Sequence, residues 1–280
     1  MASSVAIPHT EIVYRHTLAV RITHWVNAFC LLVLLLSGLQ IFNAHPTLYF
    51  GEKSEPDRAV LSMDAIQRDD GSYAGITTIG STKFDTTGVL GLSRDANGEL
   101  ESRGFPRWIT LPSYRDLATG RRWHFFFAWL FVLNGLAYLI YAAWSGHVRR
   151  DLAPTRGQLR HIGQSVWEHV RFHFPKGDQA KSYNVLQKLA YLAVIFGLLP
   201  LIVLTGLTMS PAMDAAFPFL LDIFGGRQSA RTIHFLCATG ITLFVFVHLF
   251  MVIVTGTWNN IRSMITGRYA IEPEEAPHGK

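Results

Sequence analysis

The sequence predicts an all-α integral membrane protein, in which four transmembrane helices form an up-down-up-down bundle with a long extracytoplasmic insertion between helices 1 and 2. Three observations predict this fold class. Apolar residues make up 49% of the 280 residues and charged residues only 16%, which is unusual for a soluble globular protein. The apolar residues gather in four stretches, each long enough for a helix of about 20 residues that crosses the hydrocarbon core. Polar segments of very different lengths separate these stretches.

The whole chain, residues 1–280, is expected to form a single membrane domain with helices at about 20–43, 123–145, 187–209 and 232–256. Pro200 predicts a kink in the third helix because proline cannot donate a backbone hydrogen bond. The first span is expected to be retained, since the residues before it are too polar for a signal peptide. Cys30 and Cys237 lie among apolar residues, and neither begins a CxxCH motif, which excludes covalent haem attachment.

Residues 44–120 differ from the rest of the chain because Gly, Asp, Ser and Thr occur throughout this segment. A loop of this length without structure of its own is unusual in a folded protein. The pairs Asp70-Gly71 and Asn97-Gly98 are typical of β-hairpin turns and are flanked by short β-prone runs. The segment is therefore expected to be a periplasmic subdomain, or a surface on which a partner docks.

The connector 146–183 carries many Arg and Lys residues and few acids. Short loops of this kind remain in the cytoplasm, so both termini are expected to be cytoplasmic and the insertion to lie outside, in a bacterial inner membrane. Topology also accounts for the net charge of +5, and no nucleic-acid partner is needed to explain it. Three histidines of this connector, His161, His169 and His173, are expected on the solvated surface of an interfacial helix.

Four histidines lie inside the predicted spans: His24, His124, His234 and His248. The separation of 14 residues between His234 and His248 corresponds to about 1400° of helical rotation, only about 40° short of four turns, and to a rise of about 21 Å. Both imidazoles therefore face the same side of one helix. Imidazole groups at hydrocarbon depth are costly unless they are paired or bind a ligand.

The alternating direction of the helices places these histidines at matching depths. Spans one and four are antiparallel, so His24 lies level with His248. Spans two and four are parallel, so His124 lies level with His234. The sequence thus predicts two histidine pairs, one near each face of the membrane, whichever face is cytoplasmic.

Two imidazoles that approach from facing helices provide the axial ligands that a haem b iron requires. A zinc or copper site is disfavoured because no depth offers three nitrogen or sulfur ligands, although each histidine alone could simply hydrogen-bond to a neighbouring helix. Arginine pairs well with carboxylates, so the candidates for the haem propionates are Arg21, Arg121, Arg122 and Arg231. Glycines that would let a flat ring approach the helices are Gly38, Gly135, Gly206 and Gly240.

The sequence resembles a known family in RITHWVNA of span one, GRRWHFFFAW of span two, SYNVLQKLAY before span three, and the pair His234 and His248. These motifs are similar to those of dihaem cytochrome b subunits in the bacterial cytochrome b561 and nickel-hydrogenase group, which includes formate dehydrogenase gamma and thiosulfate reductase cytochrome b subunits. The resemblance implies that His24 and His248 bind the iron of a cytoplasmic-side haem, and that His124 and His234 bind that of a periplasmic-side haem. It also implies that Asn184 and Gln187 contact a quinone.

The resemblance implies an electron-transfer subunit that connects a periplasmic oxidoreductase partner, such as a molybdenum-cofactor or iron–sulfur protein, with the quinone pool. The insertion at 44–120 is not found in the commonest members of the group. Two alternatives stay open at this point. The chain could be a stand-alone cytochrome b561-type superoxide:quinone oxidoreductase, or a haem-free anchor in which the four histidines are incidental.

Overall fold

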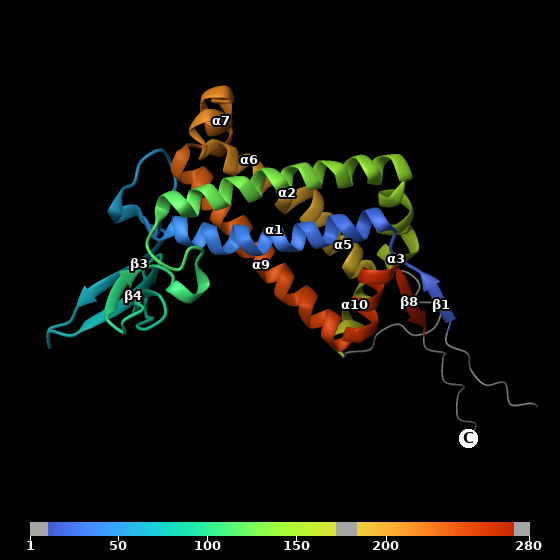
Figure 1. Cartoon of the computed structure of the whole chain (residues 1–280), viewed down its shortest axis with the longest axis horizontal. Helices are drawn as coiled ribbons and strands as arrows, with labels where there is room; N and C mark the ends of the chain where they lie inside the picture. Colours follow the sequence, from blue (N-terminus) through green and yellow to red (C-terminus); the bar gives the residue numbers. More distant parts are fainter. Residues whose placement is uncertain (1–10, 172–183, 272–280) are drawn as a thin grey trace, which may run out of the picture. The chain divides into compact units, whose positions relative to one another are not determined.

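The computed structural model describes residues 11–171 and 184–271 (Figure 1). Four helical stretches in this part of the chain are long and apolar enough to cross a membrane, and they occupy Leu18–Phe42, Leu117–Ser145, Val185–Thr208 and Arg227–Val254. The predicted fold class is confirmed. The second stretch begins earlier than predicted because Asp116 caps it: its carboxylate accepts a hydrogen bond from the backbone N–H of Thr119 at 2.9 Å and so satisfies an otherwise unpaired donor of the first turn.

Three of these stretches are single α-helices, whereas the third is interrupted. Helices α1 (Leu18–Phe42), α2 (Leu117–Ser145) and α9 (Arg227–Val254) are continuous. The third stretch consists of α5 (Val185–Ala193), a π-helical turn η5 (Val194–Leu198) and α6 (Leu199–Thr208). The π-turn ends just before Pro200, whose ring clashes with the preceding turn and whose missing N–H breaks the regular hydrogen-bond ladder.

The chain divides into two compact units, which are described separately. The first consists of Met1–Trp25, Gly135–Gly197 and Ile241–Lys280, as far as the structure describes these ranges. It contains an antiparallel pair formed by β1 (Glu11–Tyr14) and β8 (Arg268–Ile271), in register from Glu11 opposite Ile271 to Tyr14 opposite Arg268 (Figure 1). Between α9 and β8 lies α10 (Thr257–Thr266), a short helix outside the four spans.

The basic connector in the first unit is largely helical. It contains a π-helical turn η3 (Val148–Leu152), α3 (Arg156–Arg160) and α4 (Ile162–Val170). A capping box begins α3, in which the side chains of Thr155 and Gln158 each accept a hydrogen bond from the backbone N–H of the other residue. His161 is exposed, as predicted. The side chain of His169 and the whole of His173 lie outside the described residues.

The second unit, Val26–Asn134 and Leu198–Gly240, contains the insertion. One antiparallel sheet has the order β2-β3-β4-β5, and a separate hairpin is formed by β6 and β7. The predicted turns are confirmed: Asp70-Gly71 connects β3 with β4, Asn97-Gly98 connects β6 with β7, and both glycines adopt positive φ. The bounds are β2 Thr47–Leu48, β3 Leu61–Gln67, β4 Tyr73–Ile79, β5 Thr82–Asp85, β6 Gly91–Arg94 and β7 Leu100–Arg103, with single 3-10 turns η1 Pro56–Arg58 and η2 Arg107–Ile109.

Arg103 fastens the insertion to the end of α1. Its side chain is 1% exposed, and its guanidinium donates to the side-chain oxygen of Gln40 at 2.8 Å, the hydroxyl of Thr110 at 3.1 Å and the carbonyl of Ser113 at 3.1 Å. Helices α1 and α2 pack against each other through Cys30, Val33, Phe127 and Phe131. Two short helices, α7 (Pro211–Ala216) and α8 (Phe219–Phe224), precede α9. The anchored insertion is thus a structured part of this unit.

Candidate haem-binding sites

The second unit brings together His124 of α2 and His234 of α9. Their ring centroids lie 6.3 Å apart, and the ring planes are inclined at 62°. An iron bound by both imidazoles at about 2.0 Å, the usual distance between a metal and an imidazole nitrogen, holds the two ring centres about 6 Å apart. The separation of these rings therefore fits a pair of axial ligands on opposite sides of one iron.

Hydrogen bonds fix the tautomer of both rings. Nδ1 of His234 lies 3.0 Å from the carbonyl oxygen of Ile202 and 3.2 Å from the hydroxyl of Thr205. A carbonyl oxygen only accepts hydrogen bonds, so Nδ1 carries the proton and Nε2 keeps its lone pair. The hydroxyl of Thr205 donates to the carbonyl of Leu201 and can accept from the imidazole. His234 is therefore presented as a metal ligand through Nε2.

His124 is supported in the same way by the first helix. Its Nδ1 lies 3.1 Å from the hydroxyl of Ser37, which in turn donates to the carbonyl of Val33 at 2.6 Å. Because this hydroxyl proton is already used, the oxygen accepts from Nδ1, and Nε2 is again left free to bind a metal. The backbone of Leu34 is a further hydrogen-bond partner of the ring. Sequence analysis did not predict these supporting groups.

Glycines next to the two hydroxyl residues let the helices approach the rings. A Cβ atom at Gly38 would lie 3.3 Å from Cε1 of His124, and a Cβ atom at Gly206 would lie 3.3 Å from Cε1 of His234. These two glycines thus make room for the imidazoles. Gly240 faces Leu198 instead, and nothing lies within 4 Å of a Cβ atom built at Gly135.

The first unit brings together His24 of α1 and His248 of α9. Their ring centroids are also 6.3 Å apart, with the planes inclined at 57°. Trp25 contacts His24 edge-on at 5.4 Å, and Phe244 stacks on His248 at 5.9 Å. Nδ1 of His24 is buried and has no hydrogen-bond partner among the described residues. The two predicted pairs therefore have the same spacing but differ in how their rings are held.

The arrangement is that of two ligand pairs and not of a clustered metal site. Within residues 11–171 and 184–271, no group of three or more His, Cys, Asp or Glu side chains could hold a metal ion. A zinc ion needs at least three protein ligands, whereas a planar macrocycle supplies four nitrogens itself and leaves two axial positions. The donor set fits haem b.

The predicted propionate ligands have different surroundings. Arg231 donates to the backbone carbonyls of His45 and Thr47 and lies over the ring of Phe42 at 5.4 Å. It therefore connects α9 with the start of the insertion. Arg122 is exposed. Arg21 donates to the backbone carbonyl of Ile265 in α10, and its Nε is buried without a partner among the described residues.

The predicted quinone contacts begin the third span. The side-chain oxygen of Asn184 accepts from the N–H of Leu186 at 2.9 Å, and that of Gln187 accepts from the N–H of Asn184 at 3.2 Å, which makes a capping box for α5. The amide NH₂ groups of both side chains are not used in this box. Lys188, which sequence analysis did not single out, is 5% exposed, and its ammonium lies 3.4 Å from the oxygens of Ala153 and Gln158.

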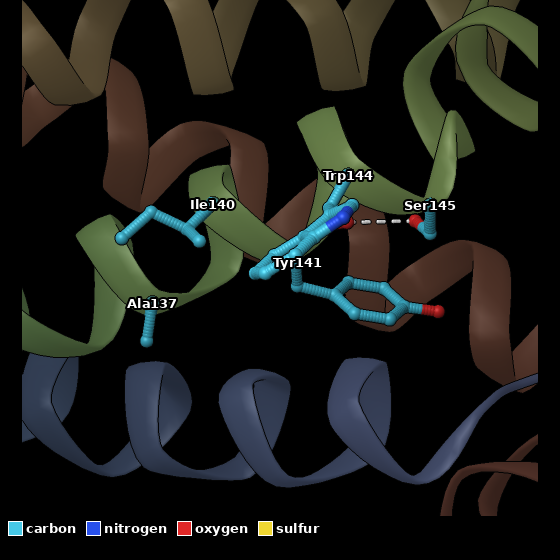
Figure 2. Close-up of a pocket in the computed structure, with 5 residues that line it drawn as sticks. All are labelled: Ala137, Ile140, Tyr141, Trp144 and Ser145. Carbon is cyan, nitrogen blue, oxygen red and sulfur yellow. Dashed lines mark hydrogen bonds between the residues drawn. The ribbon is translucent and has the colours of Figure 1, made fainter.

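An open apolar groove of about 630 Å³ lies along the end of α2 (Figure 2). It is lined by Ala137, Ile140, Tyr141, Trp144 and Ser145, whose spacing places them on one face of a single helix. The Tyr141 hydroxyl is bonded to that of Thr17 at 2.8 Å, and the Ser145 hydroxyl donates to the Tyr141 carbonyl. Its lining comes from α2, one of the four helices long and apolar enough to cross a membrane.

Comparison with known proteins decides the family. The profile of prokaryotic cytochrome b561 matches residues 15–267, which include all four histidines of the two pairs. The chain belongs to this family. The cytochrome is 26% identical over 242 residues, 86% of its own length and 91% of the relative's, to the Azospira oryzae protein named as the protein-methionine-sulfoxide reductase subunit YedZ1. It is 30% identical over 149 residues, 46% of its own length and 54% of the relative's, to the Escherichia coli K12 protein named as cytochrome YdhU.

No solved structure gives a significant match to the cytochrome. The family nevertheless makes the chain a multi-pass membrane electron carrier that uses haem b. This agrees with the prediction made from the spacing and depth of the histidines.

Proposed function

We propose that this cytochrome is the membrane subunit of a respiratory oxidoreductase complex, that it binds two haems b, and that it carries electrons between a periplasmic redox subunit and the quinone pool. The observation that carries the proposal is the repetition of one spacing: both histidine pairs have ring centroids 6.3 Å apart. Haem b supplies a one-electron iron couple when it is bound. Helix α9 contributes one ligand to each pair.

In this proposal hydrogen bonds hold the imidazole rings of His124 and His234 in one orientation. His124 and His234 are fixed through Nδ1 by Ser37 and Thr205, which raises the basicity of the ligating nitrogen. The basic connector between α2 and α5 supports a cytoplasmic position for His24 and His248 by the positive-inside rule. Both termini are then cytoplasmic, and the insertion is periplasmic with the haem of His124 and His234.

The quinone is proposed to bind near the start of α5. The free amide donors of Asn184 and Gln187 suit the two carbonyl oxygens of a quinone head group, because their oxygens are held in the capping box. The buried ammonium of Lys188, with its two long contacts, would add a third donor. Replacing Gln187 by Leu, with the exposed Gln164 changed in the same way as a control, is expected to raise the KM for quinone and leave the haem content unchanged.

The insertion is the proposed docking surface for the periplasmic subunit. It exposes aromatic side chains, among them Trp108 at 75% and Tyr114 at 61%, and such residues dominate protein–protein contacts. The relative YedZ1 is named as a subunit of a reductase. We therefore infer that the partner is a periplasmic reductase, of molybdenum-cofactor or iron–sulfur type.

Haem counting tests the proposal directly. The purified cytochrome should contain two haems b per chain by the pyridine haemochrome assay, and His248→Ala and His124→Ala should each remove one of them. One haem or none in the unaltered chain would refute the proposal. Efficient reduction of quinone by superoxide with the isolated chain would show instead that it works as a stand-alone oxidoreductase.

A further inference from the structure

Unpaired buried polar atoms in the first unit gather in three side chains. These are Nε of Arg21, Nδ1 of His24, and Nε and Nη2 of Arg262, none of which has a hydrogen-bond partner among the described residues. A buried guanidinium nitrogen without an acceptor is unfavourable because it has lost water and gained nothing. These donors therefore point to a missing acceptor.

The two arginines lie on two helices that contact each other, α1 and α10. Arg21 donates to the backbone carbonyl of Ile265, and the indole N–H of Trp25 donates to that of Met264 at 3.1 Å. Arg262 precedes Ile265 by one helical turn, so the two residues are neighbours on the surface of α10. His24 lies between Arg21 and Trp25 in the same turn of α1. The unpaired guanidinium nitrogens thus belong to two helices that meet beside a predicted haem ligand.

Helix α10 is held in place through strand β8, which pairs with β1, and through hydrogen bonds that involve Asn259 and Gly267. Strand β8 follows α10 after Gly267 and pairs with β1 along its whole length. The side chain of Asn259 bonds both the N–H and the carbonyl of Ala270, at 2.9 and 2.7 Å. Gly267 between α10 and β8 has a φ of 82°, and its carbonyl accepts from the N–H of Arg15 at 2.8 Å. Arg262 therefore lies in a helix whose C-terminal end is fixed by these contacts.

The guanidinium groups of two arginines near a predicted haem ligand can bind carboxylate groups. Guanidinium binds carboxylates with two parallel hydrogen bonds, and this charge-assisted pairing is stronger than a contact between neutral groups. Haem b carries two such carboxylates, its propionates. Phospholipid phosphate offers the same anionic oxygen chemistry, so the experiment must distinguish these two sources of the acceptor.

We propose that α10 forms part of the haem site and that Arg262, together with Arg21, binds the propionates of the haem held by His24 and His248. This inference rests on the proposed function, since it requires that haem. It assigns a role to a helix outside the four spans and to an arginine that the sequence did not identify. Both arginines act by positioning the haem and by setting the charge around it.

Redox potentiometry of the purified holoprotein tests the proposal, with Arg262→Gln as the variant and Arg268→Gln as the matched control. Arg268 is exposed in β8, so the control removes the same charge close by in the chain. Loss of a positive charge beside the propionates favours the oxidised iron. Arg262→Gln is therefore expected to lower the midpoint potential of one haem transition, to leave the other unchanged, and to reduce haem content towards half. Arg268→Gln should match the unaltered protein.

A second variant keeps the test decisive if Arg262→Gln does not fold. Arg262→Lys retains the charge but lacks the two parallel N–H donors of the guanidinium group, so one of the two haems should transfer faster to apomyoglobin. Two haems in the unaltered protein with unchanged potentials and transfer rates in these variants would overturn the inference alone. Loss of co-purified phospholipid with unchanged haem transitions would also overturn it, by assigning the guanidinium groups to lipid. Fewer than two haems in the unaltered protein would instead refute the proposed function.

Discussion

Replacing Gly206 by alanine should disturb one haem without weakening the helix that carries the change. The added Cβ atom would lie 3.3 Å from Cε1 of His234, whereas carbon atoms in contact prefer about 3.5–4.0 Å. The imidazole must therefore retreat by about 0.2–0.7 Å. Metal–ligand distances tolerate deviations of only about 0.2 Å, so the bond to the iron should weaken.

The same change stabilises the backbone of the helix, although it weakens the bond to the iron. Alanine stabilises the interior of a helix by about 0.5–1 kcal/mol relative to glycine, so α6 should be slightly more stable in the variant. Haem loss from Gly206→Ala would then report on the ligand and not on unfolding. Gly38→Ala should act alike through His124, because its Cβ atom also lies 3.3 Å from Cε1 of that ring. Gly135→Ala is the matched control, since nothing lies within 4 Å of its Cβ atom.

The assay combines haem content with the low-temperature EPR spectrum of the oxidised protein. Each of the first two variants should change one of the two low-spin signals, and the control should change neither. The double variant Gly38→Ala with Gly206→Ala should affect the same single haem, because both act on one pair. Loss of both haems in the double variant would show that His124 and His234 do not share an iron. Indistinguishable spectra in all three single variants would refute the steric argument.

Three further predictions concern the polar contacts. Thr205→Val and Ser37→Ala each remove one acceptor from an imidazole N–H. Such a bond is worth about 0.5–1.5 kcal/mol, so haem should transfer to apomyoglobin several-fold faster, and an unchanged rate would contradict the supporting role of these hydroxyls. Arg103→Met should destabilise the insertion by about 1–3 kcal/mol because buried acceptors lose their donor; limited proteolysis should detect this, while the haem content stays constant. Hydrogen bonds from the hydroxyl and N–H of Thr119 hold the pKa of Asp116 below its usual range, so its contribution to the first turn of α2 is complete above about pH 4 and is lost as the pH falls through the lowered pKa. The protection of that turn against hydrogen exchange, corrected for the intrinsic pH dependence of exchange, should fall on acidification, and Asp116→Asn should abolish this fall.

The pairing of the four histidines was predictable because their signal is strong in the sequence alone. A histidine inside an apolar span is rare and costly, and the alternating direction of four spans is enough to match His24 with His248 and His124 with His234. The hairpins of the insertion were predictable for a similar local reason, since Asp70-Gly71 and Asn97-Gly98 favour tight turns whatever surrounds them.

The groups that orient the ligands were not predictable because their role depends on which helices meet. Ser37-Gly38 and Thr205-Gly206 both place a hydroxyl and a glycine against a histidine. Thr239-Gly240 in α9 has the same pattern, yet Gly240 packs against Leu198. A hydroxyl–glycine pair in a span is thus too common to identify a site. The position of Arg262 likewise depends on the pairing of β1 with β8, two segments that lie at opposite ends of the sequence.

The support of His124 and His234 by helices that precede them in the chain bears on how the holoprotein assembles. His124 of α2 is oriented by Ser37 of α1, and His234 of α9 is oriented by Thr205 of α6. Each pair of helices can therefore present a finished half-site, with its tautomer fixed, during insertion into the membrane and before the other pair is complete. In the proposed holoprotein, haem binding would then join two preformed halves, so the cofactor would stabilise the tertiary structure as well as carry electrons.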